Sequence, residues 1–369
     1  MVVKNKKKQR TKSRFRLFLL KHHKPILLIS STFLGIFLLE ILVRVLDVHP
    51  KPLDPLPIPS YQLSQDPTIS YEYRPNYTPD SEPYDNSHLG YQINGAGFRD
   101  YDYREEKPKD VYRIIVLGDS TTAGNSISNI ENTYTKQLEK KLNATSSTKI
   151  RYEVLNMGVG GYHTMQEVQT LKVKGLKYKP DLVLLTFCVN DYDMRADGGV
   201  YWALKRANPL INENHWSSLY NLLVRYSRLA FIIHYKWIFP KISHDELRGN
   251  YEEWYSKNVL KGESTVKAGL TLLSELQLNG FAAYVAILPA FSDSFAKYGF
   301  ASIHERVLND AKQFSGIKVF DLTSYFAKYD EDGKKFSADA VHLNEYGHKV
   351  MAEILLSLFK EFNTPKKTQ

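Results

Sequence analysis

The sequence of 369 residues predicts an α/β protein whose main domain is a five-stranded parallel sheet between two layers of helices. Two observations support this fold class. From residue 111 onward, short continuous apolar runs alternate with segments of helical periodicity. Apolar runs without polar alternation are typical of parallel strands that are buried on both faces. In front of this domain, a basic tail followed by an apolar run predicts a membrane helix.

The positive charge of the chain is concentrated at its N-terminus. The net charge is +9, but residues 1–24 contain ten Lys or Arg and no acidic residue. Without this segment, 39 basic residues face 40 acidic ones, so the body is nearly neutral. A neutral body gives no electrostatic support for nucleic acid as a partner. Residues 1–24 are therefore predicted to be a basic cytoplasmic tail.

Residues 25–46 are predicted to form a transmembrane anchor. Their 22 residues would span roughly 33 Å as a helix, enough for a bilayer core. Glu40 and Arg44 lie four residues apart and can pair on one helix face. A cleaved signal peptide is the alternative, although no small-residue cleavage site follows the run. The basic flank predicts a single-pass protein with its N-terminus in the cytoplasm and its C-terminal body outside, in the periplasm or at the cell surface.

Residues 47–110 are predicted to be a linker and a strap. The first part is rich in Pro and should be extended. The second part is rich in Tyr, which argues for a strap that lies over the main domain, with residues 94–97 as a turn. Cys188 is the only cysteine, so no internal disulfide can form and the core must hold the fold.

Residues 111–365 are predicted to be the main domain. Strands are expected at 113–117, 152–157, 181–187, 282–288 and 318–322, with helices near 130–142, 164–176, 263–279 and 344–361.

Between the third and fourth strands, residues 192–260 form a predicted helical insert rich in Trp and Tyr. Its apolar residues between 216 and 237 recur every three or four positions. A packed cap, a lid over the active site and a contact with the membrane interface all fit this pattern.

Small polar residues follow several of these strands. In an open parallel sheet, ligands bind beyond the carboxyl ends of the strands. The sequences there are GDSTTAG at 118–124, NMGVGG at 156–161 and CVND at 188–191, and DAVHLN at 339–344 leads into the last helix.

These four segments resemble the four motif blocks of the SGNH hydrolases, the GDSL esterase/lipase family. The order of the segments along the chain, with an anchor and a strap before the GDS motif, also resembles that of membrane-anchored bacterial members of the family. The resemblance implies a flavodoxin-like SGNH fold, with Ser120 as the nucleophile and Asp339 and His342 as the acid and base. It also implies that Gly161 and Asn190 belong to the oxyanion hole. Cys188 stands where the family usually has Gly, which predicts a narrower pocket.

The residue types suit this chemistry on physical grounds. A Ser hydroxyl needs an adjacent base, and His342 titrates in the right range to take and return its proton. Asp339 can fix the imidazole tautomer. The N–H groups of Ser120 and Gly161 and the amide of Asn190 can converge on an oxyanion. In contrast, Asp119 and Asp191 are expected to be structural, and His348 is expected to be solvated on the last helix.

The sequence therefore predicts a serine esterase that cleaves O-acyl esters through an acyl-Ser120 intermediate. One alternative is an O-acyltransferase that moves acetyl groups onto or off an envelope polysaccharide, and another is a non-catalytic protein that binds glycan. The expected partners are an ester substrate, including an acylated glycan, and the membrane. No cofactor and no metal are expected, because the chain has no P-loop and no metal-ligand spacing of His.

Overall fold

The computed structural model describes residues 2–46, 60–78, 92–146, 149–192, 223, 227–233, 265–292 and 294–363. The chain divides into two compact units. The first contains residues 1–55 and 212–246, and the second contains residues 56–211 and 247–369.

The second unit is built on a five-stranded parallel sheet, as the sequence predicts. Its strands have the order β4-β3-β5-β6-β7 and are all parallel. Their bounds are β3 Val111–Leu117, β4 Arg151–Asn156, β5 Leu182–Phe187, β6 Ala282–Ile287 and β7 Ile317–Asp321. The chain leaves β3 toward one edge and returns beside it with β5, so β3 lies at the topological switch point where such sheets bind ligands.

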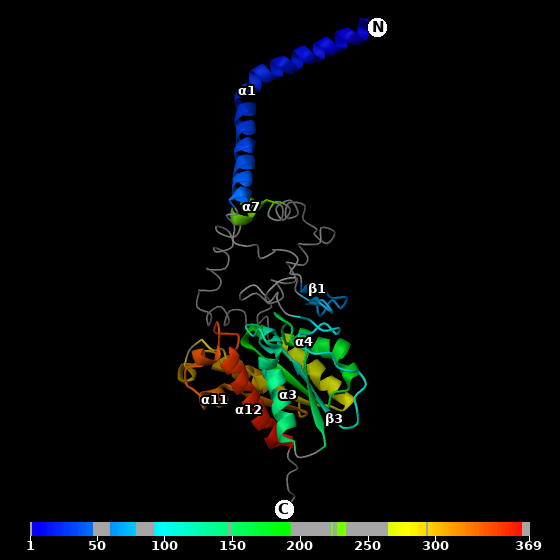
Figure 1. The fold of residues 1–369 in the computed structure, drawn as a ribbon, viewed down its shortest axis with the longest axis vertical. Coiled ribbons are helices and arrows are strands. Elements are labelled where there is room, and N and C mark those ends of the chain that lie inside the picture. The colour runs from blue at the N-terminus through cyan, green and yellow to red at the C-terminus, as the bar shows by residue number, and fades with distance from the viewer. Residues whose placement is uncertain are drawn as a thin grey trace, which may run out of the picture. The chain divides into compact units, whose positions relative to one another are not determined.

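Helices cover both faces of this sheet, which confirms the three-layer prediction. Ile114 and Val116 of β3 face one hydrophobic cluster, while Ile115 and Leu117 face the other. Residues of α3 (Tyr134–Thr145), α11 (Thr323–Ala327) and α12 (Glu345–Asn363) complete the first cluster, and Figure 1 shows α3 and α12 side by side. Residues of α4 (Thr164–Thr170), a helix at 265–276 and α10 (Ala301–Lys312) complete the second.

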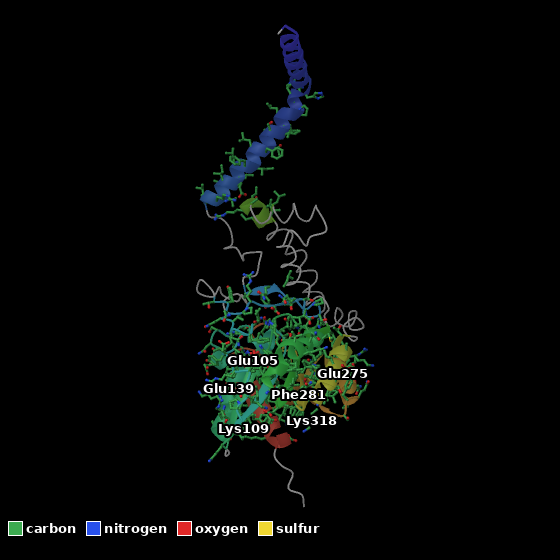
Figure 2. All side chains as sticks on the ribbon, turned by 90° about the vertical axis from the view of Figure 1, so that its right-hand side faces the viewer. Glu105, Lys109, Glu139, Glu275, Phe281 and Lys318 are labelled. Carbon is green, nitrogen blue, oxygen red and sulfur yellow. The ribbon has the colours of Figure 1, made fainter. Side chains whose placement is uncertain are left out.

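Helix α10 was not predicted from the sequence. Its apolar residues Ile303, Val307, Leu308 and Ala311 pack toward the second cluster, and most of its other residues are polar. It supplies the crossover that two parallel strands, β6 and β7, require. Figure 2 labels Glu139 of α3, beside the β4 edge, and Lys318 of β7 at the opposite edge.

Short helical segments connect these elements. They are α2 Ser120–Ala123, η1 Ile130–Asn132, η2 Leu171–Gly175, η3 Leu176–Tyr178, η4 Val189–Tyr192, η6 Gln277–Asn279, η7 Phe295–Lys297 and η8 Gly333–Phe336.

Described parts of the segment predicted as a strap pack into the second unit. Strands β1 (Tyr61–Leu63) and β2 (Tyr71–Tyr73) form an antiparallel pair. Their tyrosine side chains are almost fully buried in the cluster that α4 shares. The hydroxyl of Tyr71 donates to the carbonyl of Gly160, 3.0 Å away. The predicted turn at 94–97 has its backbone closed by a bond from the Gly97 N–H to the Asn94 carbonyl. Residues 47–59 and 79–91 lie outside the described part.

The first unit contains a long N-terminal helix, α1 (Val2–Val45), with a break at His22. Pro25 explains the break, because proline removes a helical hydrogen bond and clashes with the preceding turn. Residues His22–Val45 are long and apolar enough to cross a membrane, a test that signal sequences and buried core helices also pass. The expected pair of Arg44 with Glu40 is present, at 2.7 Å.

Most of the predicted insert at 192–260 lies outside the described residues. Its described helix, α7 (Arg228–Ile233), falls within the segment whose periodicity predicts a helix. In the first unit, the N–H groups of Arg228 and Leu229 donate to the Glu40 carboxylate, each at 2.9 Å. The cap, lid and membrane-contact interpretations of the insert remain hypotheses.

Candidate active site

The turn that follows β3 places Ser120 at the start of helix α2. Asp119 is the N-cap, and its Oδ1 accepts the N–H of Thr121 at 2.8 Å. Ser120 is the first residue of the helix, so its N–H has no intrahelical partner. Gly124 closes the helix with φ 78°, a conformation that favours glycine. Both the hydroxyl and the unbonded backbone N–H of Ser120 therefore lie at the carboxyl end of β3.

The structure brings Ser120, His342 and Asp339 into one hydrogen-bonded relay. His342 Nε2 lies 2.9 Å from Ser120 Oγ, and its Nδ1 lies 2.6 Å from Asp339 Oδ2. Asp339 Oδ1 also accepts the N–H groups of Val341, at 3.1 Å, and His342, at 2.8 Å. The backbone of this loop therefore holds the Asp339 carboxylate in contact with the His342 imidazole. This arrangement can move a proton from the Ser120 hydroxyl to the imidazole.

The ionisation of the relay follows from these contacts. Burial lowers the pKa of His342, but the hydrogen bond and charge of Asp339, with the charge of Asp119, outweigh burial and raise it above 6.5. Burial raises the pKa of Asp339, yet its bonds to His342 lower that pKa overall to about 2. Asp339 is therefore ionised at neutral pH, where it can hold the imidazolium.

Asn190 is held near the carboxyl end of β3 by a hydrogen bond to Asp119. Asn190 lies in η4 after β5, and its Nδ2 donates to Asp119 Oδ2 at 2.7 Å. One N–H of that amide remains for a substrate. Asp119 was expected to be structural, and it bonds the nearby Thr121 N–H as well as the distant Asn190 amide. A fully buried carboxylate therefore sets the orientation of Asn190.

Gly161 lies in the loop after β4, which packs beside α2. The N–H of Val159 donates to the carbonyl of Gly118 at 3.1 Å, so this loop is tied to the start of the nucleophile turn. Gly161 has φ 80°, which a residue with a Cβ rarely adopts. Its N–H donates to no group in the described part of the chain.

Two further carboxyl groups are buried behind η4. Asp191 accepts the hydroxyl of Thr164 at 2.8 Å, and Glu167 of α4 lies close enough to interact with Asp191 electrostatically. Burial, together with the neighbouring carboxylates, raises the pKa of Glu167 and of Asp191 well above their usual values. In the described structure, neither oxygen of Glu167 has a hydrogen-bond partner.

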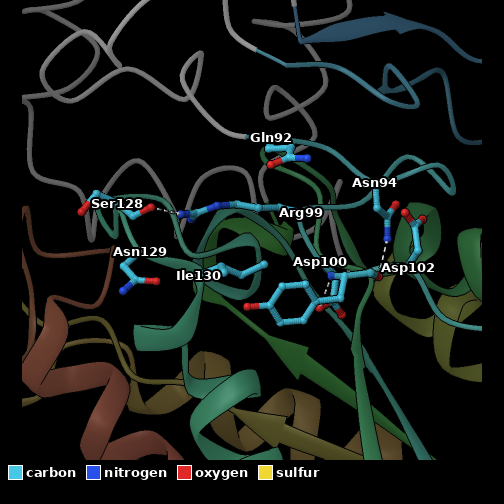
Figure 3. A pocket seen from close by; sticks show the side chains of 9 residues that line it. Gln92, Asn94, Arg99, Asp100, Asp102, Ser128, Asn129 and Ile130 are labelled. Atoms are coloured by element: carbon cyan, nitrogen blue, oxygen red, sulfur yellow. Dashed lines mark hydrogen bonds between the residues drawn. The ribbon is translucent and has the colours of Figure 1, made fainter.

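Arg99 holds the loop that follows Ser120. Its Nη1 donates to the carbonyls of Ala123, at 3.1 Å, and Gly124. Its Nη2 donates to those of Ile127 and Ser128, the latter at 3.2 Å (Figure 3). A single guanidinium, itself almost fully buried, therefore binds four backbone carbonyls, from the last residue of the nucleophile helix to Ser128. Arg99 lies two residues after the predicted turn at 94–97, and sequence reasoning assigned it no role in the site.

The neighbouring Asp100 ties the same segment to β4. Its Oδ2 accepts the N–H of Asn156, at 2.6 Å, at the end of that strand. It also pairs with buried Lys136 of α3 at 2.7 Å.

The expectation for His348 was wrong. It is fully buried, its Nδ1 accepts the N–H of Tyr134 at 3.1 Å, and its ring stacks on the Tyr134 ring. Burial, with the charges of Arg99 and His342, lowers its pKa to about 3. The imidazole is therefore neutral at physiological pH and acts as a backbone cap for α3.

A small apolar cavity of about 30 Å³ lies beside Asn190 and beside Val341, the residue before His342. Its lining comes from the exit of β5, the exit of β6, the start of α10 and the His342 loop: Cys188, Val189, Asn190, Leu288, Pro289, Ala290, Phe300 and Val341. That space admits about two water molecules or a methyl group. Within the described residues, no group of three or more His, Cys, Asp or Glu is placed to hold a metal ion.

Residues 116–350 match the family described as GDSL-like Lipase/Acylhydrolase. Similar solved structures include an acetyl xylan esterase, with 18% identity, a TM-score of 0.41 and coverage of 67% of this chain and 98% of that one. Another is a lipase/acylhydrolase from Enterococcus faecalis, with 15% identity, a TM-score of 0.40 and coverage of 69% and 99%. No curated protein was found to match.

The family match extends over more than half of the chain, from the middle of β3 to the first turns of α12. It includes the β3 exit with Ser120, the η4 turn with Asn190 and the loop with Asp339 and His342. On this basis the chain belongs to the GDSL-like lipase/acylhydrolase family and is an SGNH-type esterase.

Proposed function

We propose that this protein is a membrane-anchored esterase whose extracytoplasmic domain cleaves O-acyl esters through an acyl intermediate on Ser120. The observation that carries the proposal is the continuous relay from Ser120 Oγ through His342 to Asp339, with contacts of 2.9 and 2.6 Å. This geometry pairs a nucleophile with a base and the base with an orienting carboxylate.

In the first half-reaction, Ser120 Oγ forms a bond to the ester carbonyl carbon while His342 Nε2 takes the hydroxyl proton. The negative charge moves to the carbonyl oxygen, where the N–H groups of Ser120 and Gly161 and the amide of Asn190 can stabilise it. Collapse breaks the bond to the alcohol oxygen, which leaves with the proton from His342. In the second half-reaction, water takes the place of the alcohol and releases the acid.

The cavity beside Asn190 supports a preference for short acyl groups. Its volume of about 30 Å³ has room for a methyl group but not for a fatty chain. Cys188 is one of its walls, and its Sγ lies 3.5 Å from Asp119 Oδ1. An acetyl ester is therefore the proposed substrate class.

A fluorophosphonate probe tests the nucleophile. Wild-type protein should be labelled, and Ser120→Ala and His342→Ala should lose both labelling and the hydrolysis of 4-nitrophenyl acetate, by about 10⁴–10⁶-fold in kcat. Thr323→Ala, a change at the start of α11, is the matched control. If Ser120→Ala keeps its activity, the proposed mechanism is wrong.

An acyl series tests the pocket. The value of kcat/KM should fall as the acyl group becomes longer than acetyl, and Cys188→Gly should relieve that fall. A true lipase pocket would show the opposite trend, because each buried CH₂ adds about 0.8 kcal/mol. A series that rises up to palmitoyl would exclude the short-acyl proposal.

The acyl acceptor distinguishes hydrolysis from transfer to a sugar hydroxyl. Acetylation of an added oligosaccharide, measured by mass spectrometry beside acetate release, would identify the transferase alternative. The relay argues against a protein that only binds glycan.

A reporter fusion tests the proposed membrane topology. A reporter enzyme that is active only outside the cytoplasm should be active when it is fused after residue 369.

A further inference from the structure

A second and much larger cavity lies beside the loop that Arg99 holds. It has a volume of about 420 Å³, within the range of small-molecule sites, about 300–1,000 Å³. Figure 3 shows the side chains that line it, which come from the strap segment at 92–102 and from the loop at 128–130. Neither the relay nor the small apolar cavity shares these residues.

The charges of this cavity do not favour an anionic ligand. The Arg99 guanidinium is directed at backbone carbonyls of the neighbouring loop. Asp100 is neutralised by Lys136, 2.7 Å away. Asp102, whose Oδ1 accepts the Gly95 N–H at 2.9 Å, adds a negative charge that would repel an anion. An apolar ligand fits no better, because Ile130 is the single aliphatic side chain among the described lining residues.

The remaining lining groups suit a neutral ligand with many hydroxyl groups. Tyr101 is 47% exposed. Its hydroxyl donates to Glu131, and Lys136 Nζ lies 5.8 Å from its ring centroid, over one face. The ring is a flat apolar surface of the kind on which a pyranose face can pack. Around it are the amide of Gln92, the hydroxyl of Ser128 and the amide of Asn129. Asn129 Oδ1 accepts the Glu131 N–H at 3.0 Å, which leaves the NH₂ group of that side chain to donate.

We propose that this cavity is a sugar-binding subsite, in which Tyr101 supports a pyranose ring and Asn129 bonds its hydroxyl groups. The proposal rests on the proposed function and names the alcohol part of the ester as a glycan. One chain segment connects the two sites. It runs from α2 with Ser120 past Ser128 and Asn129 into η1, where Asn132 Nδ2 donates to Glu345 Oε1 at 3.0 Å, three residues after His342.

The first experiment compares two substrates on the full chain in detergent. The probes are acetylated xylo-oligosaccharide, with a glycan alcohol, and 4-nitrophenyl acetate, without one. Tyr101→Ala and Asn129→Ala should each lower the ratio of kcat/KM for the glycan ester to that for the small ester by about tenfold. Tyr329→Ala is the matched control, because Tyr329 is equally exposed, at 44%, and lies outside the cavity. An unchanged ratio in both cavity variants would overturn the proposal.

The second experiment separates binding from catalysis. Unacetylated xylohexaose, mannohexaose and cellohexaose are titrated into the full-length Ser120→Ala variant and followed by calorimetry. Binding of one of them at millimolar concentration, weakened about tenfold by Tyr101→Ala, is the expected result. If esters are cleaved but none of the three sugars binds, the subsite is wrong and the esterase mechanism stands. If a sugar binds but Ser120 is not labelled by the probe, the mechanism is wrong and the subsite stands.

Discussion

The two supports of the Ser120–His342 contact are built in opposite ways. On the base side, Asp339 and His342 are three residues apart, and the Asp339 side chain is half exposed. On the nucleophile side, Arg99 contacts backbone 24 to 29 residues away, and Asp119 meets Asn190 across 71 residues, with Arg99 and Asp119 almost fully buried.

This difference predicts how each side responds to mutation. A local, half-exposed contact supports the reaction without holding the fold together, so its loss should change activity far more than stability. Loss of a buried long-range contact should lower both activity and stability, because an unsatisfied buried polar group costs about 1–3 kcal/mol.

Asp339→Asn should have the largest effect, a loss of up to about 10⁴-fold in kcat with little change in melting temperature. Activity needs neutral His342, so wild-type kcat/KM should rise with pH through a midpoint above 6.5. Asn removes the charge that raises the His342 pKa, so the residual activity should have its midpoint at lower pH. Asp330→Asn, which breaks an exposed bond to Lys335, is the control. A midpoint that does not move would contradict the assigned role of Asp339.

Asn190→Ala should lower kcat by about 10²–10³-fold, the usual effect of removing one oxyanion donor. Asp119→Asn should lower kcat as well, because an amide has one acceptor oxygen and cannot accept from both the Thr121 N–H and the Asn190 amide. If Asp119 acts by positioning Asn190, the double variant should be less impaired than the sum of the single effects predicts. Full additivity in the cycle, measured as kcat, would show that the two residues act independently.

Arg99→Lys should lower kcat by about 10²-fold, because a small displacement of the nucleophile loop is enough for such a loss. A lysine cannot reach four carbonyls with one planar fork. Arg113→Lys is the matched control, since Arg113 is equally buried but binds Glu153, at 2.6 Å, and the Tyr178 carbonyl, at 2.7 Å. Both variants should melt at lower temperature, and only Arg99→Lys should lose kcat. If Arg99→Lys and Arg113→Lys lose activity equally, Arg99 contributes only to the stability of the fold.

The same contrast explains what the sequence predicted. All five sheet strands start within two residues of their predicted positions, because a buried parallel strand is a local apolar run. The spacing of Asp339 and His342 is also local. Arg99 and the contact of Asp119 with Asn190 depend on which distant segments meet, and no local pattern encodes that. His348 was misjudged for the same reason, since Tyr134 of α3 buries it.

The smallest expected effect concerns Glu167, a buried carboxyl group outside the relay. Its pKa is raised in the folded protein, so between the unfolded value of 4.5 and the folded value the native state binds more protons than the unfolded chain. Stability should therefore fall as pH rises through that window. Glu167→Gln removes this penalty and should raise the melting temperature at pH 8 by about 2–4 °C, with less change near pH 5. Glu305→Gln, at an exposed position of α10, should leave the pH dependence of melting unchanged. If Glu167→Gln is instead less stable than wild type at pH 8, the ionised carboxylate of Glu167 must be bound by a partner outside the described residues. The buried cluster would then support the η4 turn through ionised Glu167, and not through its protonated form.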